Sequence, residues 1–333
     1  MNLGIEILRM LLCFWVIAFH FAGDKNKSKY KILKTFYHVP TFMLISFYFS
    51  YRIFNSKDII KYKIRLERLL IPYIIWPLLF VLIFFPFHSI HSIHSIFSIL
   101  IRKIIINLLI QYITGYRIIG CLWFVHNLIF FGIFFQIIYF LFNKQSLFIL
   151  QIFFFFSYLL QYKEINYKIF HEYPIHIRIF SYIFEMMPIA ITGLILRKID
   201  ILKKISNDKK NVFFFSIIVL YLIYNYNVFG AIKGFNFVGI KLNIAGICLF
   251  VSFSLIPFHK INNKIILSIL KIITRYTGGI YYSQNTTFNV LTKFDYLNQN
   301  PFIKCLMIYF LGFLICFVFT KIFKNNRLKY LFN

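Results

Sequence analysis

The sequence is poor in charged residues, glycine and proline. Only 14% of its 333 residues are charged, and it contains 13 glycines and 8 prolines. The low glycine and proline content excludes collagen-like and low-complexity disordered chains. Soluble domains carry about a quarter charged residues, and a chain that is 60% hydrophobic has too little polar surface to cover itself. The excess apolar surface must face lipid, which indicates a polytopic membrane protein.

Acidic residues are scarcer still. There are 10 of them against 37 Lys and Arg, which gives a formal net charge of +27. In a soluble chain this balance would suggest binding to nucleic acid. Here the basic residues gather in short loops between apolar runs, where they orient spans and meet anionic lipid headgroups. We therefore expect membrane lipid, and no nucleic acid, as a partner.

Cysteines are few and show no paired spacing. All lie within or at the edge of apolar runs, which argues against a disulfide framework and against a metal site. They are Cys13, Cys121, Cys248, Cys305 and Cys316.

Apolar runs near 20 residues long predict about ten transmembrane helices. The runs are too long for barrel strands and lack their alternation, and only helices or closed barrels satisfy the backbone in lipid. The predicted fold is an all-α bundle, with residues 1–333 as one membrane domain without a soluble catalytic appendage. The first run lacks a basic n-region and a cleavage signal, so we expect it to stay in the protein. The expected spans are about 3–22, 36–54, 69–87, 119–142, 147–161, 182–196, 211–229, 240–258, 273–291 and 302–323.

The distribution of Lys and Arg predicts that both termini are cytoplasmic. Most basic residues lie in the expected loops 52–68, 197–210 and 260–275 and in the tail from Lys321. One loop disagrees, because this orientation places the first connection, with Lys25, Lys27, Lys29, Lys31 and Lys34, outside.

A short histidine repeat occupies residues 88–96, with His88, His91 and His94 at a spacing of three. On a helix the first and last of these point about 120° apart, and no carboxylate or Cys stands nearby. We interpret the repeat as a low-complexity segment at the membrane interface without a metal-binding role. A helix lying on the outer leaflet is expected to follow it at 98–113.

The first span contains Glu6, Arg9 and His20. An ionisable group at mid-helix costs about 2.5 to 3.5 kcal/mol on insertion scales, so it usually pairs or has a function. Glu6 and Arg9 are three residues apart and can pair. Arg9 and His20 share a face but differ in depth by about 16 Å. This arrangement suits an anionic, phosphate-bearing group entering from inside and a proton moved near the outside. A structural Glu–Arg pair with an interfacial His explains the spacing equally well.

Five short stretches, in the same order along the chain, resemble motifs of the membrane-bound acyltransferase family 3. The family's first helix has an acidic residue, then Arg, then ten residues, then His, which matches Glu6, Arg9 and His20. The others are residues 39–46 against V-P-x-F-F-x-I-S-G, 65–73 against R-x-x-R-L-x-x-P-Y, 122–124 against L-W-F, and 279–282 against G-I-Y-L.

Three positions depart from the family's pattern. The Gly that follows Ser46 in the family is Phe47, the His before L-W-F is Cys121, and the His after G-I-Y is Gln284. The acceptor side of the site therefore lacks histidines that the family usually has, and His20 is the main candidate base. His126, one turn beyond Trp123, is a candidate substitute.

The resemblance implies transfer of an acyl group, usually acetyl from acetyl-CoA, to a hydroxyl of a cell-envelope glycan in the inner membrane of a bacterium. His20 would act as general base, Arg9 would hold the donor and Glu6 would orient Arg9.

Three other charged residues, Arg65, Arg68 and Glu185, are further candidates for the site. Arg65 and Arg68 would attract the CoA nucleotide, although orientation by positive charge accounts for them equally well. Glu185, in the sixth expected span, is either a partner for a basic residue or an interfacial acid. The alternative functions are a polysaccharide polymerase, a lipid-linked-sugar flippase, or a degenerate acyltransferase acting as a transporter or scaffold.

Overall fold

The computed structural model describes residues 3–21, 38–84, 95–114, 122–160, 175–201, 212–214, 216–217, 240–256, 264–292, 300–324 and 326–332. In these ranges the chain is helical and has no strand, so the all-α prediction is confirmed. The elements are α1 (Leu3–Phe21), α3 (His38–Ser56), α4 (Ile59–Phe84), α5 (Ser95–Thr114), α6 (Trp123–Phe142), η4 (Asn143–Gln145), α7 (Ser146–Leu160), α9 (Ile175–Lys198), α12 (Ile240–Leu255), α13 (Lys264–Arg275), α14 (Thr277–Leu291), α16 (Pro301–Ile322) and η7 (Arg327–Leu331).

Four stretches of described helix are long and apolar enough to cross a membrane. They are Leu3–Phe21, Ile59–Ile83, Trp123–Ser157 and Pro301–Ile322. Two shorter apolar helices cover Ile104–Ile113 and Asn243–Leu255, and most of the expected span 211–229 lies outside the described residues. The chain is therefore an all-helical membrane protein, while the count of ten spans stays a prediction.

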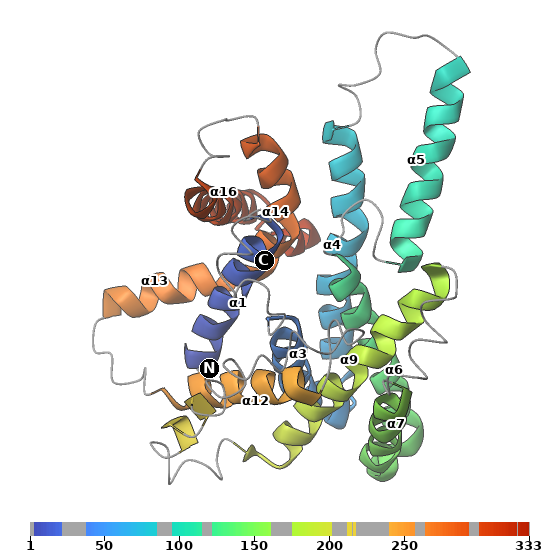
Figure 1. Cartoon of the computed structure of the whole chain (residues 1–333), viewed down its shortest axis with the longest axis vertical. Coiled ribbons are helices and arrows are strands. Elements are labelled where there is room, and N and C mark those ends of the chain that lie inside the picture. The colour runs from blue at the N-terminus through green and yellow to red at the C-terminus, as the bar shows by residue number, and fades with distance from the viewer. Residues whose placement is uncertain are drawn as a thin grey trace.

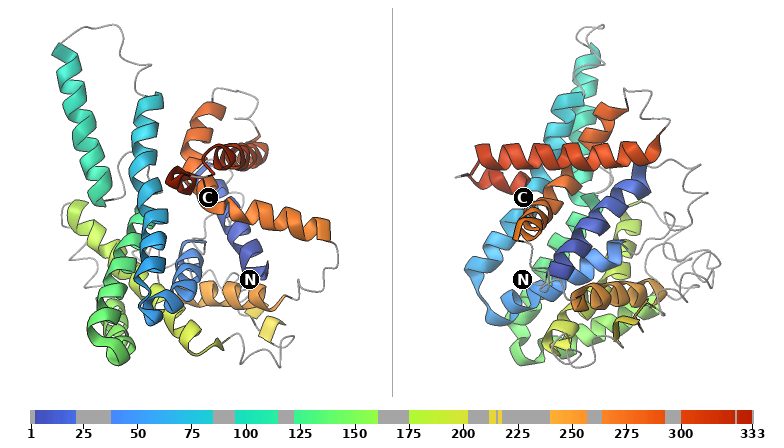
Figure 2. Two further views of the ribbon diagram at one scale, coloured as in Figure 1. Left: turned by 180° about the vertical axis from the view of Figure 1, so that it is seen from behind. Right: turned by 90° about the vertical axis from the view of Figure 1, so that its left-hand side faces the viewer.

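Helix α1 is surrounded by several other helices. It packs against α3, α12, α13, α14 and α16, and Figure 1 shows these helices around it. Helices α4 and α5 run side by side, and α16 runs across the direction of α4 in both views of Figure 2. The helix that carries Glu6, Arg9 and His20 thus has neighbours on several sides.

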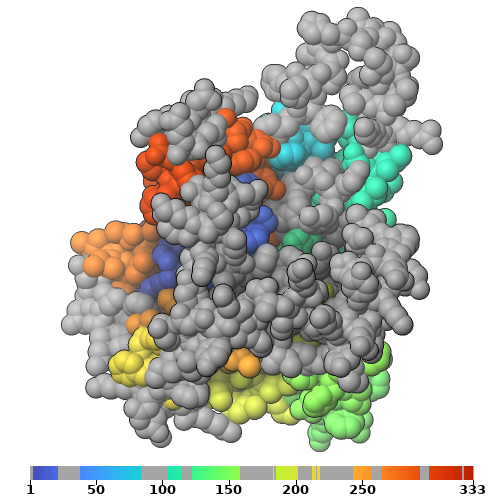
Figure 3. Space-filling model, in the orientation of Figure 1, coloured from blue at the N-terminus to red at the C-terminus, as the bar shows by residue number. Residues whose placement is uncertain are grey.

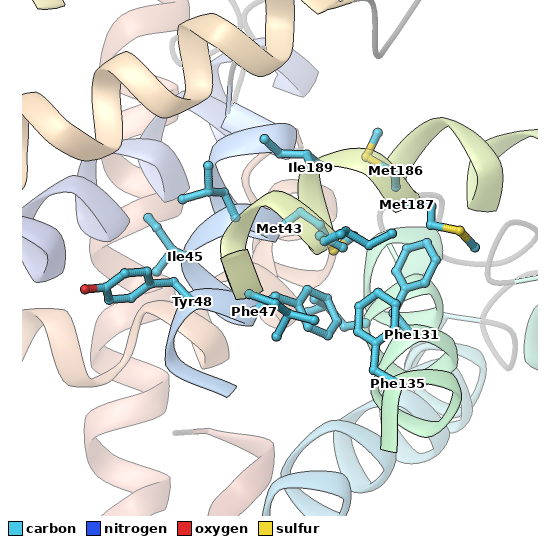
Figure 4. Close-up of a cluster of buried hydrophobic side chains, with 14 of the residues drawn as sticks. Met43, Ile45, Phe47, Tyr48, Phe131, Phe135, Met186, Met187 and Ile189 are labelled. Carbon is cyan, nitrogen blue, oxygen red and sulfur yellow. The ribbon is translucent and has the colours of Figure 1, made fainter. Parts of the chain in front are cut away.

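The largest apolar core joins α3, α6 and α9. Phe47 is fully buried, and its ring centroid lies 5.1 Å from that of Phe135 and 6.1 Å from that of Phe131. Met186 and Met187 of α9 complete this cluster (Figure 4). The side chain that replaces the family's glycine at position 47 is therefore a central core residue.

Large apolar side chains also cover much of the outside. Along α6 and α7 these include Ile133, Ile137, Phe140, Phe148, Ile152 and Phe155, each at least 40% exposed. Leaving such surface in water would cost roughly 25 cal/mol per Å², so these faces require lipid.

The region 264–292 corrects two expectations. Residues 264–275 were expected in a basic loop, but they form α13, which meets α14 at Tyr276. Helix α13 lies at the margin of the molecule (Figure 3), with Ile265, Ile269 and Ile272 at least 44% exposed. Isoleucines at this helical spacing form an apolar stripe that suits a membrane interface. The expected span 273–291 is therefore wrong at its start, because the helix there begins at Thr277.

Helix α4 starts earlier than the expected span because Asp58 caps it. The backbone N–H of Lys61 donates to Asp58 Oδ1 at 3.0 Å, and the Lys61 ammonium lies 2.9 Å from the other carboxylate oxygen. The first of these contacts is the main reason that the pKa of Asp58 is lowered from its ordinary value. Lys57 makes the tight turn from α3 with a positive φ of 52°. The residues from Ile59 to Arg68, expected in a loop or at its end, therefore belong to the helix.

Candidate functional site

Glu6 and Arg9 form an ion pair on α1, as their spacing predicts. Arg9 Nη1 donates to Glu6 Oε2 at 2.9 Å. The Glu6 side chain is 12% exposed and that of Arg9 is 35% exposed. The carboxylate therefore holds the guanidinium from the buried side and leaves part of it open to a ligand.

His20 lies at the other end of α1 and is exposed. The ring of Phe19 lies 5.3 Å from the His20 ring and 5.5 Å from the His38 ring, between centroids. His38 begins α3 and is only 2% exposed. His38 was not among the residues predicted from the sequence, although it directly precedes the Val39-Pro40 motif. Phe19 thus lies against both imidazoles at this end of α1.

Helix α14 runs along the second half of α1. The Cys13 thiol donates to the Thr277 carbonyl at 3.6 Å, and the Phe21 and Phe288 rings stack at 4.3 Å. Gln284 lies seven residues after Thr277 and four before Phe288, so all three share the face towards α1.

Gln284 itself is 1% exposed, and within the described structure neither its amide nitrogen nor its amide oxygen has a hydrogen-bond partner. A buried amide of this kind is costly unless something else satisfies it. The structure thus brings Gln284 towards the end of α1 that carries His20.

A buried lysine lies at the same end. Lys304, in the first turn of α16, is 7% exposed, and its ammonium lies 4.4 Å from the Phe288 ring centroid. Lys304 was not predicted, because in the sequence it is a single lysine at the start of an apolar run and does not differ from the other lysines near loops.

The two arginines predicted to bind the donor lie on α4 in different surroundings. Arg65 Nη2 donates to Ser46 Oγ at 3.0 Å, and its guanidinium lies 5.8 Å from the Phe47 ring centroid. Arg68 is exposed and lies 5.4 Å from the Tyr330 ring centroid. Arg65 therefore ties α4 to α3, whereas Arg68 faces solvent beside the C-terminal residues.

The remaining candidate residues described lie on α6 and α9. His126 and Trp123 are half-buried in α6, and the His126 ring lies 6.1 Å from that of Tyr73. No described group bonds His126 Nδ1. Glu185 is half-buried in α9. Cys121 and most of the histidine repeat at 88–96 lie outside the described residues.

A family model for an acyltransferase domain matches residues 2–321. The chain belongs to acyltransferase family 3. This match covers all five motif stretches, and it supports a membrane acyltransferase over a polymerase or flippase. Comparison with curated proteins and with solved structures finds no match.

As an acyltransferase of this family, the protein brings separate motif stretches into contact. The motif at residues 39–46 meets the motif at residues 65–73 through the Ser46–Arg65 hydrogen bond. The departure at Phe47 leaves this contact intact, because the ring packs into the core. The departure at Gln284 keeps a polar group where the family usually has His.

Proposed function

We propose that this membrane acyltransferase moves an acetyl group from acetyl-CoA to a hydroxyl of a lipid-linked or surface polysaccharide, with His20 as general base. His20 would take the hydroxyl proton while the oxygen attacks the thioester carbonyl carbon. The carbon–sulfur bond then breaks, and the CoA thiolate leaves and takes up a proton. A positioned base of this kind contributes about 10² to 10⁴ in rate.

The observation that carries the proposal is the arrangement of α1 within a chain of this family. A held, partly exposed guanidinium lies in its first half and an exposed imidazole at its end, about 16 Å apart along the axis. Arg9 can bind an anionic part of the donor by charge-assisted hydrogen bonds, and the extended arm of CoA can run along the helix towards His20.

The acceptor end has polar groups that fit a sugar carrying a phosphate. The buried Gln284 amide can exchange hydrogen bonds with hydroxyls. The Lys304 ammonium at the same end supplies a positive charge for the phosphate of a lipid-linked sugar.

The contact between α4 and the C-terminal residues indicates that the start of α4 and the C-terminal residues lie on the same side of the membrane. Arg327 Nη1 lies 3.4 Å from Glu67 Oε1, so the start of α4 and the tail lie on one side of the membrane. Both regions are basic, which favours the cytoplasm and the inner membrane of a bacterium, where acetyl-CoA is made.

The test is the acetate content of purified surface polysaccharide, measured by NMR, in cells that carry only a variant of this protein. We expect His20→Ala to remove the acetate while the protein still inserts into the membrane. His126→Ala, in the same assay, separates the two candidate histidines, and we expect it to retain acetylation.

Lys144→Ala, an exposed substitution in η4, is the control for expression and insertion. Full acetylation with His20→Ala would exclude His20 as the base. Unchanged acetate after removal of the whole protein would refute the polysaccharide acceptor.

A further inference from the structure

The last part of the chain folds back onto the motif-bearing end of α4. Residues 326–332, here called the C-terminal segment, start with the Asn326 side chain accepting the Leu328 backbone N–H at 3.1 Å. Arg327 then pairs with Glu67 at 3.4 Å, and Trp76 Nε1 donates to the Leu331 carbonyl at 3.2 Å. Contacts at both ends thus fix the segment along more than two turns of α4.

The segment is also anchored to α14 and α16. Leu331 and Phe332 are 4% and 6% exposed, and the Phe332 ring stacks on Phe319 at 5.0 Å. At Gly279, the first residue of the G-I-Y motif, an added Cβ would lie 2.6 Å from the Phe332 carbonyl oxygen. Glycine at this position therefore allows the C-terminal backbone to approach α14.

This anchoring presents a cluster of cations around one aromatic ring. Tyr330 has the Arg68 guanidinium 5.4 Å and the Lys329 ammonium 5.6 Å from its ring centroid. Arg68 and Arg327 are exposed, and Lys329 and Tyr330 are half-buried. Cations held over an aromatic face are oriented before a ligand arrives.

We propose that the C-terminal segment completes the binding site for the phosphate-bearing nucleotide of the acyl donor. The proposal rests on acetyl-CoA being the donor. Lys329 and Arg68 bind the phosphates, and Tyr330 orients Arg68 and offers an edge or face to the base.

A nucleotide fits this cluster better than a lipid headgroup does. Attraction to an anionic membrane needs only charge near the surface. Here the cations are fixed around a ring, and Glu67 neutralises Arg327 within the same cluster. That arrangement favours a ligand with both phosphates and a planar ring.

The test is calorimetric binding of free CoA to the full-length protein in nanodiscs of neutral phosphatidylcholine, with pantetheine, which lacks the nucleotide, as the second ligand. We expect Lys329→Ala and Tyr330→Ala each to weaken CoA binding about tenfold and to leave pantetheine binding unchanged. Lys329→Arg should restore CoA binding, which excludes misfolding as the cause. Lys144→Ala removes the same charge from the distant α6–α7 turn and should bind CoA as the unmodified protein does.

The outcomes separate this inference from the function on which it rests. If the unmodified protein does not bind CoA, the donor assignment fails and the site with it. If it binds CoA and only Arg68→Ala weakens binding, the C-terminal segment has no part in the site, while the acyltransferase proposal stands. If the Lys329 and Tyr330 variants bind CoA normally but adhere less to vesicles containing phosphatidylglycerol, the cluster binds lipid headgroups and the inference is overturned.

Discussion

At the scale of single residues, the Glu6–Arg9 pair shows why an acid accompanies the cation that we propose to bind the donor. A lone guanidinium within an apolar helix would be costly to insert. Glu6 offsets this cost from the buried side, and Arg9 remains 35% exposed. The pair therefore keeps a positive charge on α1 without closing it to a ligand.

Glu6→Gln should raise the KM for acetyl-CoA and leave kcat nearly unchanged. Gln keeps the size of the side chain and a hydrogen-bond acceptor but removes the charge that orients Arg9. Because Arg9 is partly exposed, the interaction is worth about 1 kcal/mol or less, so we expect a rise of about fivefold at most. Steady-state kinetics in detergent with a glycan acceptor measures both constants.

Asp58→Asn is the matched control, since it removes the charge from another i,i+3 pair, that with Lys61, at the start of α4. It should leave the KM unchanged. An equal effect of both substitutions would mean that the KM responds to general charge and not to Arg9.

Local spacing was sufficient to predict this pair but not the contacts between helices. Glu6 and Arg9 share one helix, so three residues of separation determine their distance. The contact of Arg65 with Ser46 and the approach of His38 to Phe19 depend on how α3 packs against α4 and α1. Sequence periodicity carries no information on that packing, so the Arg65–Ser46 contact was not predicted and His38 was missed.

At the scale of elements, α3 and α9 cross in close contact. A Cβ at Gly193 would lie 2.5 Å from the Leu44 carbonyl oxygen and 3.0 Å from the Tyr48 backbone nitrogen. Arg197, one turn further on, donates to the Tyr48 hydroxyl at 3.0 Å. Small residues at such crossings allow membrane helices to pack by van der Waals contact, and this crossing holds α3 in the position where Ser46 meets Arg65.

Gly193→Ala should lower the thermal stability of the protein. The neighbouring atoms belong to the backbone of α3 and cannot rotate away, so the helices must separate, at a cost of about 1 to 3 kcal/mol. Intrinsic fluorescence during heating in detergent measures the unfolding midpoint.

Gly132→Ala provides the control on α6, because a Cβ there would meet nothing within 4 Å. Its midpoint should stay the same or rise, since Ala favours helix over Gly by up to about 1 kcal/mol. Equal midpoints for both variants would contradict the close contact of α3 and α9.

Helix existence followed from the long apolar runs, but helix ends did not. The sequence placed α1, α6 and α16 within a few residues of their observed bounds. It failed at α13, where Lys271 and Arg275 made an amphipathic helix resemble a basic loop. Hydropathy averaged over a whole span does not detect an apolar stripe of isoleucines. A search for apolar residues that recur with the helical period of 3.6 residues does detect it.

At the scale of the whole molecule, Arg9 and His20, the residues proposed for donor and acceptor, lie towards opposite ends of α1. In our proposal, the donor uses Arg9 of α1 together with the C-terminal segment that packs on α4. The acceptor end combines His20 with the end of α14 and the start of α16. A transferase that takes its donor from one side of a membrane and its acceptor from the other needs this separation.

Labelling of single cysteines should place these two ends on opposite sides of the membrane. In a background with the five native cysteines replaced by Ala, we expect Asn55→Cys and Lys324→Cys to react with an impermeant maleimide only in inside-out vesicles. Asn300→Cys, at the start of α16, should react in intact spheroplasts. Reaction of Asn55→Cys and Lys324→Cys from different sides would be incompatible with the Arg327–Glu67 contact. If Asn55→Cys and Lys324→Cys instead react in intact spheroplasts and Asn300→Cys only in inside-out vesicles, the contact stands but the protein has the opposite orientation. Acetyl-CoA would then have to come from the other side of the membrane.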